Sequence, residues 1–332
     1  MGKDKDKKWK KEQKRLKKLR KEEEKRRKKQ YVYQQIQGQQ QFYFNPYLIS
    51  SWNNAQYFQQ SVLPVNNFTY ETFDQIRNHN SIESALAELK SLAIDLDTVD
   101  YNQFTMDINR VCFICCNNYD SPQYKLGVGP INDSITVAAN HKMMGYYIYY
   151  LHNPKSQRFL QYLELFFRRT TEFLTVYYSG HGSRVKDTSG DESDGYDEVM
   201  IFDDTYVLDD TLSGMIRAYV NGRAKIILLN DCCHSGTIWD IPTNGQEMQY
   251  FPPNIICLSA ADDNETAKQG RQNNNDQGFF TFFLFQEVRR NRAITPRDIE
   301  NRVSSLLSKY NQCVVVSPTR PEMMDYPLFP QY

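Results

Sequence analysis

The sequence of 332 residues contains no long apolar run. No stretch approaches the roughly 18 uninterrupted apolar residues of a membrane-spanning helix, and the charged first residues lack the apolar core of a secretory signal. The seven cysteines are an odd number, which argues against a disulfide framework. These absences exclude a transmembrane protein and predict a reduced protein of the cytoplasm, with the nucleus as an alternative location.

A net charge is also absent, because 40 Lys and Arg residues balance 40 Asp and Glu residues. The balance hides an asymmetry: residues 1–30 hold 17 basic and 6 acidic side chains, so the remainder has a charge of −11. We expect any attraction to anionic lipid or nucleic acid to reside in residues 3–29. A tail that only keeps the protein in solution has the same composition, so both interpretations stay open.

The chain divides into three parts by composition. Residues 1–30 form the basic tail, and residues 31–105 form an extension rich in Gln, Asn and Tyr. Such polar and aromatic alternation is typical of disordered, association-prone segments. Within it, residues 81–96 place apolar side chains at helical spacing, which predicts a short helix that packs on the main domain or links to it. Residues 106–332 form the third part.

From about residue 109, short apolar runs alternate with helical segments. This pattern is typical of an α/β protein with a central, mostly parallel sheet flanked by helices. The expected strands are the apolar runs 111–116, 146–151, 173–178, 224–229, 255–259 and 314–317. The expected helices are the segments 131–144, 156–169, 209–219, 279–290 and 296–310.

Two of the expected strands end in residues that can carry chemistry. One leads into SGHG at 179–182 and the other into DCCHSG at 231–236. Catalytic groups gather beyond the carboxyl ends of parallel strands, and a thiol needs a nearby imidazole to form a thiolate and later protonate the leaving amine. The pattern predicts a cysteine–histidine pair, with a plain loop histidine as the alternative. Zinc is disfavoured because the Cys and His residues are consecutive.

The segments YSGHG at 178–182 and DCCHSG at 231–236 together resemble the metacaspases, and the Gln-rich and Tyr-rich extension resembles their type I branch. The resemblance runs from about residue 111 to 332 and includes DGYDE at 194–198 and SAADDN at 259–264. It implies a caspase-like (caspase–hemoglobinase) fold after a disordered N-terminal extension, and a monomeric cysteine endopeptidase. Cys233 is the implied nucleophile, because it directly precedes His-Ser-Gly, and His181 is the implied acid–base partner. Backbone amides near Gly182 and Cys233 are the implied donors to the oxyanion.

The same resemblance implies a specificity. Metacaspases cleave after Arg or Lys, and the family's pocket positions fall on Asp133, Ser179 and Asp231. Carboxylates suit a guanidinium because they accept charge-assisted, bidentate hydrogen bonds. We therefore expect protein or peptide substrates with Arg or Lys before the cut bond. Asp133 also fits a plain helix cap, since a helix is expected to begin there.

Many metacaspases require calcium, and the matching carboxylates here are Asp197, Asp209, Asp210 and Asp240. Calcium takes six to eight oxygen ligands, so converging carboxylates suit an activating Ca²⁺ ion that takes no direct part in catalysis. Helix caps and solvated loop charges are the alternative, because Asp209 and Asp210 open an expected helix.

Three further expectations follow. The segment QGFFT at 277–281 is bulkier than the family pattern and is expected to narrow the substrate groove. Lys268, Arg271 and the basic tail are candidate self-cleavage sites.

The rival class is a non-proteolytic scaffold, in which the Gln-rich and Tyr-rich extension recruits assembled partners. A Cys233→Ala protein that keeps its cellular effect without hydrolysing peptides distinguishes the two.

Overall fold

The computed structural model describes residues 79–186, 195–233, 236–242, 251–260, 269–272 and 275–331. The described residues do not include the basic tail, most of the extension, His234 or Lys268. The scaffold and tail hypotheses therefore stay predictions. Of the hairpin residues 269–272, 275 and 276, only the backbone is described. Within the described ranges, no helix combines the length and the apolar character that crossing a bilayer requires.

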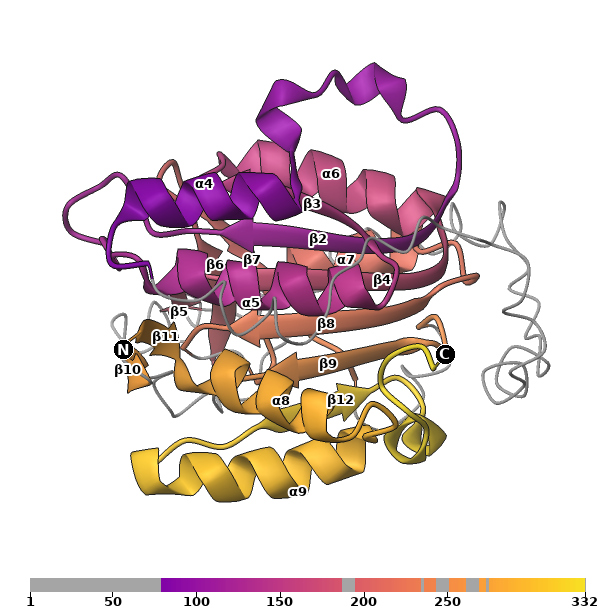
Figure 1. Cartoon of the computed structure of the whole chain (residues 1–332). Coiled ribbons are helices and arrows are strands. Elements are labelled where there is room, and N and C mark those ends of the chain that lie inside the picture. The colour runs from indigo at the N-terminus through magenta and orange to yellow at the C-terminus, as the bar shows by residue number, and fades with distance from the viewer. Residues whose placement is uncertain are drawn as a thin grey trace, which may run out of the picture. The chain divides into compact units, whose positions relative to one another are not determined.

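A seven-stranded sheet runs through the centre of the fold in the order β1-β3-β2-β4-β8-β9-β12 (Figure 1). Its strands are β1 (Ile94–Asp95), β2 (Ile108–Cys116), β3 (Tyr147–His152), β4 (Thr170–Ser179), β8 (Lys225–Asp231), β9 (Ile255–Ser259) and β12 (Val315–Pro318). All neighbouring pairs are parallel except β12, which runs antiparallel to β9. The carboxyl ends of the parallel strands therefore share one edge of the sheet.

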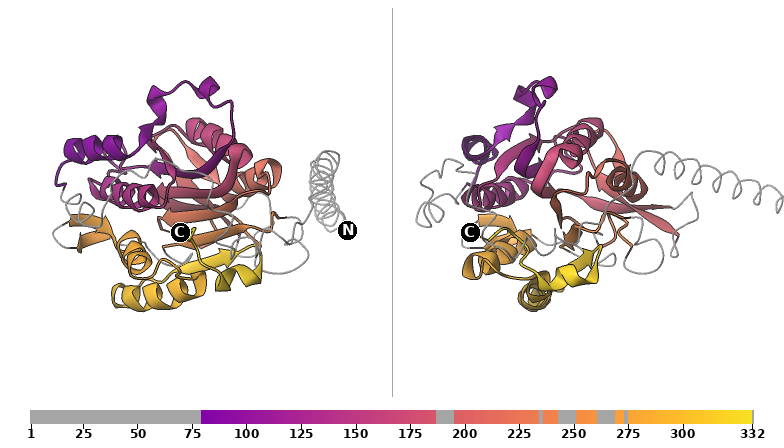
Figure 2. Two further views of the ribbon diagram at one scale, coloured as in Figure 1. Left: turned by 45° about the vertical axis from the view of Figure 1, so that its right-hand side comes forward. Right: turned by 90° about the vertical axis from the view of Figure 1, so that its right-hand side faces the viewer.

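Helices cover both faces of this sheet (Figures 1 and 2). One face carries α4 (Ile82–Leu92), α5 (Gly129–Met143), α8 (Phe279–Arg290) and α9 (Pro296–Leu307). The other face carries α6 (Ser156–Arg169) and α7 (Asp209–Tyr219). This two-sided burial explains why β2, β4 and β8 are nearly continuous apolar runs rather than alternating ones.

The cysteine doublet at the end of β2 shows how the two faces divide the core. Successive side chains of a strand point to opposite faces. Cys116 accordingly packs in the core on the α5 side, and Cys115 packs in the core on the α6 side. Both thiols are fully buried, and burial raises the pKa of Cys116 to about 12. The doublet is core packing.

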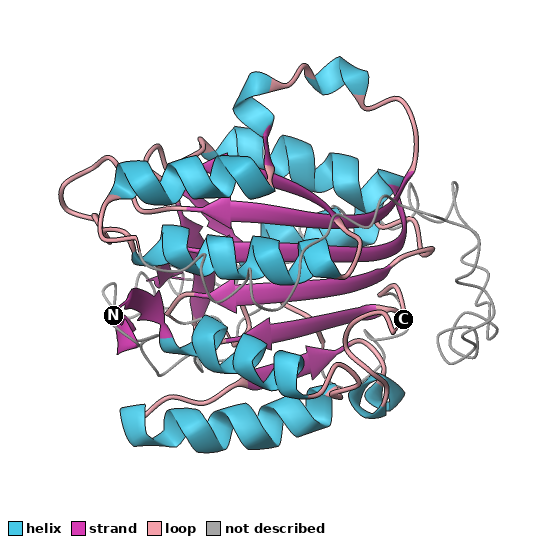
Figure 3. Cartoon of the chain, in the orientation of Figure 1, coloured by secondary structure: helices cyan, strands magenta, loops and turns pink. Residues whose placement is uncertain are grey.

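The expected α/β architecture with a mostly parallel sheet is confirmed, and the expected strands and helices correspond to observed elements (Figure 3). The last helix is shorter than expected, since α9 ends at Leu307 and residues 308–310 form a 3₁₀ turn. The helix expected at 81–96 ends at Leu92, packs against α5 and leads into β1. The sheet thus begins before residue 106, the expected start of the third part.

The structure also contains two small antiparallel units that the sequence analysis did not predict. One is a three-stranded sheet of β5 (Gly182–Lys186), β6 (Tyr196–Ile201) and β7 (Tyr206–Leu208). The other is the hairpin of β10 (Gln269–Gln272) and β11 (Asn275–Gly278). Their polar and charged sequences lack the apolar runs that identify buried strands. Both follow strands of the central sheet and lie beside its carboxyl edge (Figure 1).

Candidate active site

Strand pairing brings the two reactive loops together. Strands β4 and β8 are parallel neighbours, and their last residues, Ser179 and Asp231, are in register. His181 and Cys233 each follow two residues later in the chain. Gly182 is packed so tightly that a Cβ atom there would overlap the backbone carbonyl oxygen of Cys233. The histidine and cysteine loops therefore meet at the carboxyl edge of the sheet.

The ring of His181 has a defined hydrogen-bonding state. Its Nε2 atom lies 2.8 Å from the backbone carbonyl oxygen of Tyr124. A carbonyl oxygen only accepts hydrogen bonds, so Nε2 of the neutral ring carries the proton and donates. The lone pair is then on Nδ1, the nitrogen left to accept a proton from another group. The ring is only half-buried, which leaves room for a substrate beside it.

The two adjacent cysteines occupy different environments. Cys232 is buried at 1% exposure within the core on the α6 side, whereas Cys233 is half-buried. A buried structural thiol is inert, while a nucleophile needs partial exposure. The burial pattern favours Cys233 over Cys232 as the reactive thiol. His234 and Ser235, which follow it, are outside the described residues.

The three expected pocket residues converge on the same edge. Asp133 lies in the first turns of α5, and Ser179 and Asp231 end their strands; all three are buried. Burial, together with the charge of Asp231, raises the pKa of Asp133 well above its usual value. Burial likewise raises the pKa of Asp231 to about 6. The structure thus places two buried carboxyl groups next to each other.

The end of β11 and the first turn of α8 contact these carboxyl groups. The backbone N–H of Gly278 donates to both carboxyl oxygens of Asp133, at 3.1 and 2.9 Å. The Thr281 hydroxyl donates to Oδ2 of Asp231 at 2.7 Å. A Cβ atom at Gly278 would overlap the Asp231 carboxyl group. Asp133 is not the helix cap considered above, because the N-cap of α5 is Val128 and the Asp133 carboxyl group serves β11 instead.

The expectation that residues 277–281 narrow the groove is wrong for the two phenylalanines. Phe280 is fully buried and Phe279 nearly so, and both pack in the core on the α5 side. Phe279 stacks on Tyr310 with ring centroids 3.8 Å apart. The bulk of both rings is therefore taken up by the core, where apolar surface is stabilised by burial.

The carboxylates implied as calcium ligands fall into two groups. Asp197 on β6 and Asp209 at the start of α7 are buried close to Glu198. Burial and these neighbouring acids raise the pKa of Asp209 to about 7. Its two oxygens accept hydrogen bonds from the backbone N–H groups of Glu198 and Asp210, at 2.9 and 2.7 Å. The Asp209 carboxyl group thus ties α7 to β6.

The other two residues point elsewhere. Asp210 is exposed, and Asp240 forms an ion pair with Arg217 at 3.7 Å. Among the described residues, no three Asp, Glu, His or Cys side chains are grouped as a metal site requires. The Asp209 oxygens thus accept from backbone amides and Asp240 pairs with an arginine, so the calcium ligand set implied by the resemblance stays a prediction.

Sequence reasoning missed the residues that surround His181. Tyr119 stacks on the imidazole with centroids 5.0 Å apart, and Tyr124 supplies the carbonyl oxygen at Nε2. Both lie in the loop between β2 and α5. The only signal in the sequence is that this loop also leaves the carboxyl edge of the sheet, where ligands and catalytic groups gather.

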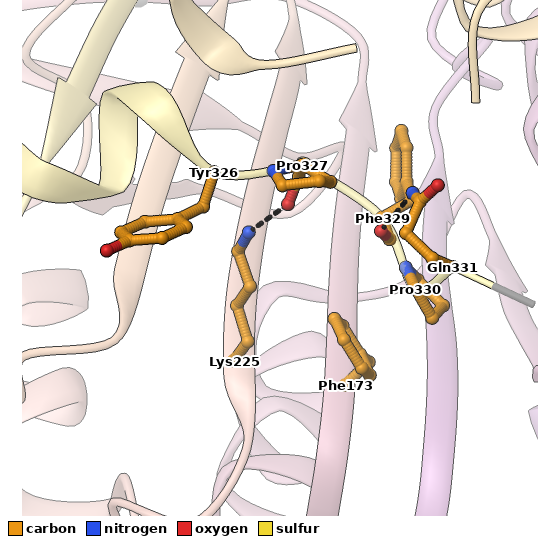
Figure 4. A pocket seen from close by; sticks show the side chains of 7 residues that line it. All are labelled: Phe173, Lys225, Tyr326, Pro327, Phe329, Pro330 and Gln331. Atoms are coloured by element: carbon orange, nitrogen blue, oxygen red, sulfur yellow. Dashed lines mark hydrogen bonds between the residues drawn. The ribbon is translucent and has the colours of Figure 1, made fainter. Parts of the chain in front are cut away.

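A small pocket lies at the opposite end of the sheet, where β8 begins (Figure 4). Its wall includes Phe173, Lys225 and C-terminal residues such as Pro327. The ammonium group of Lys225 donates to the Pro327 carbonyl oxygen at 2.7 Å. Because Lys225 starts the strand that Asp231 ends, this pocket is separate from the candidate active site.

The sequence matches a known protein family over the region that carries this site. Residues 109–325 match the family described as the caspase domain. Metacaspase-1A of Neurospora crassa is 38% identical over 73 residues, which are 21% of this chain and 16% of that protein. Metacaspase-1 of Arabidopsis thaliana is 40% identical over 73 residues, 21% of this chain and 20% of that protein. The matched stretches thus span about a fifth or less of these relatives.

The fold also matches a solved structure. Protein GSU0716 of Geobacter sulfurreducens superposes with a TM-score of 0.52 at 18% identity, and the superposition covers 67% of this chain and 98% of that one. At this identity the likeness concerns the fold alone. The family match, by contrast, covers well over half of the chain. The chain therefore belongs to the caspase-domain family, as a metacaspase-like member.

Proposed function

We propose that this protein is a cysteine endopeptidase in which Cys233 is the nucleophile and His181 the acid–base partner. One observation carries the proposal: the in-register ends of β4 and β8 and the contact of Gly182 with the Cys233 carbonyl bring a half-buried thiol and a half-buried imidazole to one edge of the sheet. The separate environments of Cys232 and Cys233 support the choice of nucleophile.

The tautomer of His181 suggests how the first step proceeds. Nδ1 accepts the Cys233 proton, and the thiolate attacks the carbonyl carbon of the scissile peptide bond. The resulting tetrahedral intermediate carries a negative oxygen, which backbone N–H groups near Gly182 and Cys233 stabilise. The Tyr124 carbonyl, 2.8 Å from Nε2, stabilises the imidazolium that forms.

The remaining steps return the site to its starting state. The imidazolium donates its proton to the leaving amine as the C–N bond breaks, which leaves a thioester on Cys233. His181 then takes a proton from a water molecule, and the hydroxide attacks the thioester carbonyl. Collapse of the second tetrahedral intermediate releases the acid and restores the thiol.

The acidic pocket is the basis for a proposed preference for Arg or Lys before the cut bond. Asp133 and Asp231 are buried neighbours, and Asp231 lies only two residues before the nucleophile. A guanidinium between two carboxylates gains charge-assisted hydrogen bonds, whereas an acidic side chain would be repelled. Calcium activation is a separate proposal from the resemblance, and no step above depends on it.

Paired fluorogenic peptides test this function. The protein is incubated with peptides that have Arg, Lys or Asp before the reporter group, in the presence of calcium or of a chelator. The Cys233→Ala variant is the negative control. Release after Arg and Lys that disappears in this control supports the nucleophile and the pocket together. Release after Asp contradicts the acidic pocket. No release by protein with a native circular dichroism spectrum contradicts the peptidase proposal.

A further inference from the structure

The loop at residues 117–128, here called the tyrosine loop, joins β2 to α5 and is held firmly at its beginning. Oδ1 of Asn153 accepts hydrogen bonds from the backbone N–H groups of Asn118 and Tyr119, at 2.9 and 3.0 Å. The Asp203 carboxylate accepts from the N–H groups of the next two residues, at 2.9 and 3.2 Å. The position of Tyr119 is thus set by side chains from two other loops.

Tyr119 makes two different contacts with His181. Its ring stacks on the imidazole, with centroids 5.0 Å apart and planes inclined by 25°. Its hydroxyl accepts a hydrogen bond from the backbone N–H of His181 at 2.6 Å and donates to the Ile201 carbonyl oxygen at 3.0 Å. One side chain therefore restrains both the main chain and the ring of the proposed acid–base residue.

The backbone of Tyr119 has an unusual conformation. Its φ angle is +61°, in the left-handed region that bulky residues rarely adopt. Such a conformation is unfavourable and persists only where the surrounding structure determines it. The hydrogen bonds that the backbone N–H groups of Asn118 and Tyr119 donate to Asn153 supply that determination. In this conformation the ring stacks on His181.

Tyr178 places a second hydroxyl beside that of Tyr119, with the two oxygen atoms 3.4 Å apart. Its hydroxyl lies 2.9 Å from the carbonyl oxygen of His181, to which it can donate. Tyr119 and Tyr178 are both almost fully buried, and burial raises the pKa of each phenol, so both stay neutral. The N–H and the C=O of His181 therefore each have a neutral, buried tyrosine hydroxyl within hydrogen-bond distance, and the Tyr178 hydroxyl also lies 2.8 Å from the Ile201 carbonyl oxygen.

We propose that Tyr119 is a positioning residue for His181, which holds the imidazole in the orientation that serves Cys233. The proposal rests on the proposed function, since it assigns Tyr119 a role in that same reaction. The physical reason is geometric: a displacement of about 1 Å in a reacting group can cost about 100-fold in rate. The half-buried imidazole has the tyrosine loop on one side, through the Tyr119 ring and the Tyr124 carbonyl.

Two substitutions separate the two contacts. Tyr119→Phe keeps the stacked ring and removes the hydroxyl, whereas Tyr119→Leu removes both. Tyr149→Phe is the matched control, because Tyr149 is also a buried tyrosine and its ring packs beside Phe104 and Phe166. Native circular dichroism and thermal melting of each variant establish that it is folded before its kinetics are compared.

The first readout is kcat against KM with the Arg peptide. We expect about a tenfold lower kcat for Tyr119→Phe, because a buried N–H loses its acceptor, and about a 100-fold lower kcat for Tyr119→Leu, with KM unchanged in both. Tyr149→Phe is expected to match the wild type. Unchanged kcat in both Tyr119 variants, or an increase in KM alone, overturns the proposal.

The second readout does not require peptide hydrolysis. The rate at which iodoacetamide alkylates Cys233, followed by mass spectrometry, reports the thiolate that His181 generates. We expect His181→Ala and Tyr119→Leu both to slow this alkylation. If the wild type hydrolyses no peptide, the proposed function fails, while this comparison still tests the positioning. Slow alkylation in His181→Ala but wild-type alkylation in Tyr119→Leu overturns the role of Tyr119 alone.

Discussion

Ser179 and Asp231 face each other as the last paired residues of two parallel strands, and the chain leaves both at the same level of the sheet. Parallel strands with matched ends deliver the residues that follow them to one place. His181 and Cys233, each two residues later, thereby lie on loops that contact each other, although 52 residues separate them in the sequence. The proposed acidic pocket lies at the same edge, since Asp231 is one of its residues.

Asp231→Asn tests the charge of the pocket. The substitution keeps the shape and removes the charge that would pair with a guanidinium, so kcat/KM for an Arg peptide is expected to fall about 100-fold. Steady-state hydrolysis measures the change. Asp325→Asn is the control, because Asp325 is exposed and pairs with Arg297 at the surface. Equal losses in both variants, or none in Asp231→Asn, contradict the assignment.

Gly278→Ala tests the close approach between β11 and the pocket. The added methyl group would overlap the Asp231 carboxyl group and displace the N–H that bonds Asp133. We expect at least about a tenfold loss of kcat/KM toward Arg peptides and a lower melting temperature, since overpacking costs about 1–3 kcal/mol. At Gly214 in α7, nothing lies within 4 Å of an added Cβ. Gly214→Ala is therefore expected to leave activity intact, and the reverse ranking would refute this view of the pocket.

Lys225→Met tests the buried amine at the opposite end of the sheet. Burial lowers the pKa of Lys225 from 10.5 to about 7, whereas the unfolded chain keeps its proton up to the higher value. Between these pH values the unfolded state binds more protons, so the Lys225 contribution to wild-type stability becomes more favourable as the pH rises. The melting temperature of the variant minus that of the wild type should therefore be larger at pH 6 than at pH 9.

A control for this linkage is Lys155→Met, at an exposed lysine before α6. Its difference in melting temperature from the wild type is expected to change little between the same two pH values. A difference for Lys225→Met that stays constant or grows with pH would show that the amine is not held in a pKa-lowering environment.

Calcium dependence is tested by activity and by binding. The resemblance predicts faster hydrolysis of the Arg peptide with calcium than with a chelator. Because Asp240 is paired with Arg217 in this structure, binding requires its carboxylate to leave that pair. Asp240→Asn is expected to weaken calcium binding in calorimetry, while Asp325→Asn is not. Equal hydrolysis rates with calcium and chelator contradict calcium activation.

The central sheet was predictable because its signal is local. Strands buried on both faces, such as β4 and β8, must be apolar along their whole length, and the intervening helices must be amphipathic. The small sheet from β5 to β7 lacked this signal, since polar residues interrupt it. The reversal of β12 was equally hidden, because an apolar run of four residues does not encode its direction.

For the candidate site, the sequence alone determined the reactive residue types, with His181, Asp231 and Cys233 at or just after strand ends and Asp133 near the start of an expected helix. Only the tertiary structure decided what surrounds them. The Tyr124 carbonyl that determines the histidine tautomer and the Tyr119 ring that stacks on it come from a loop more than 50 residues earlier. Such contacts depend on how loops from separate strands pack in three dimensions, and no spacing along the chain records that packing.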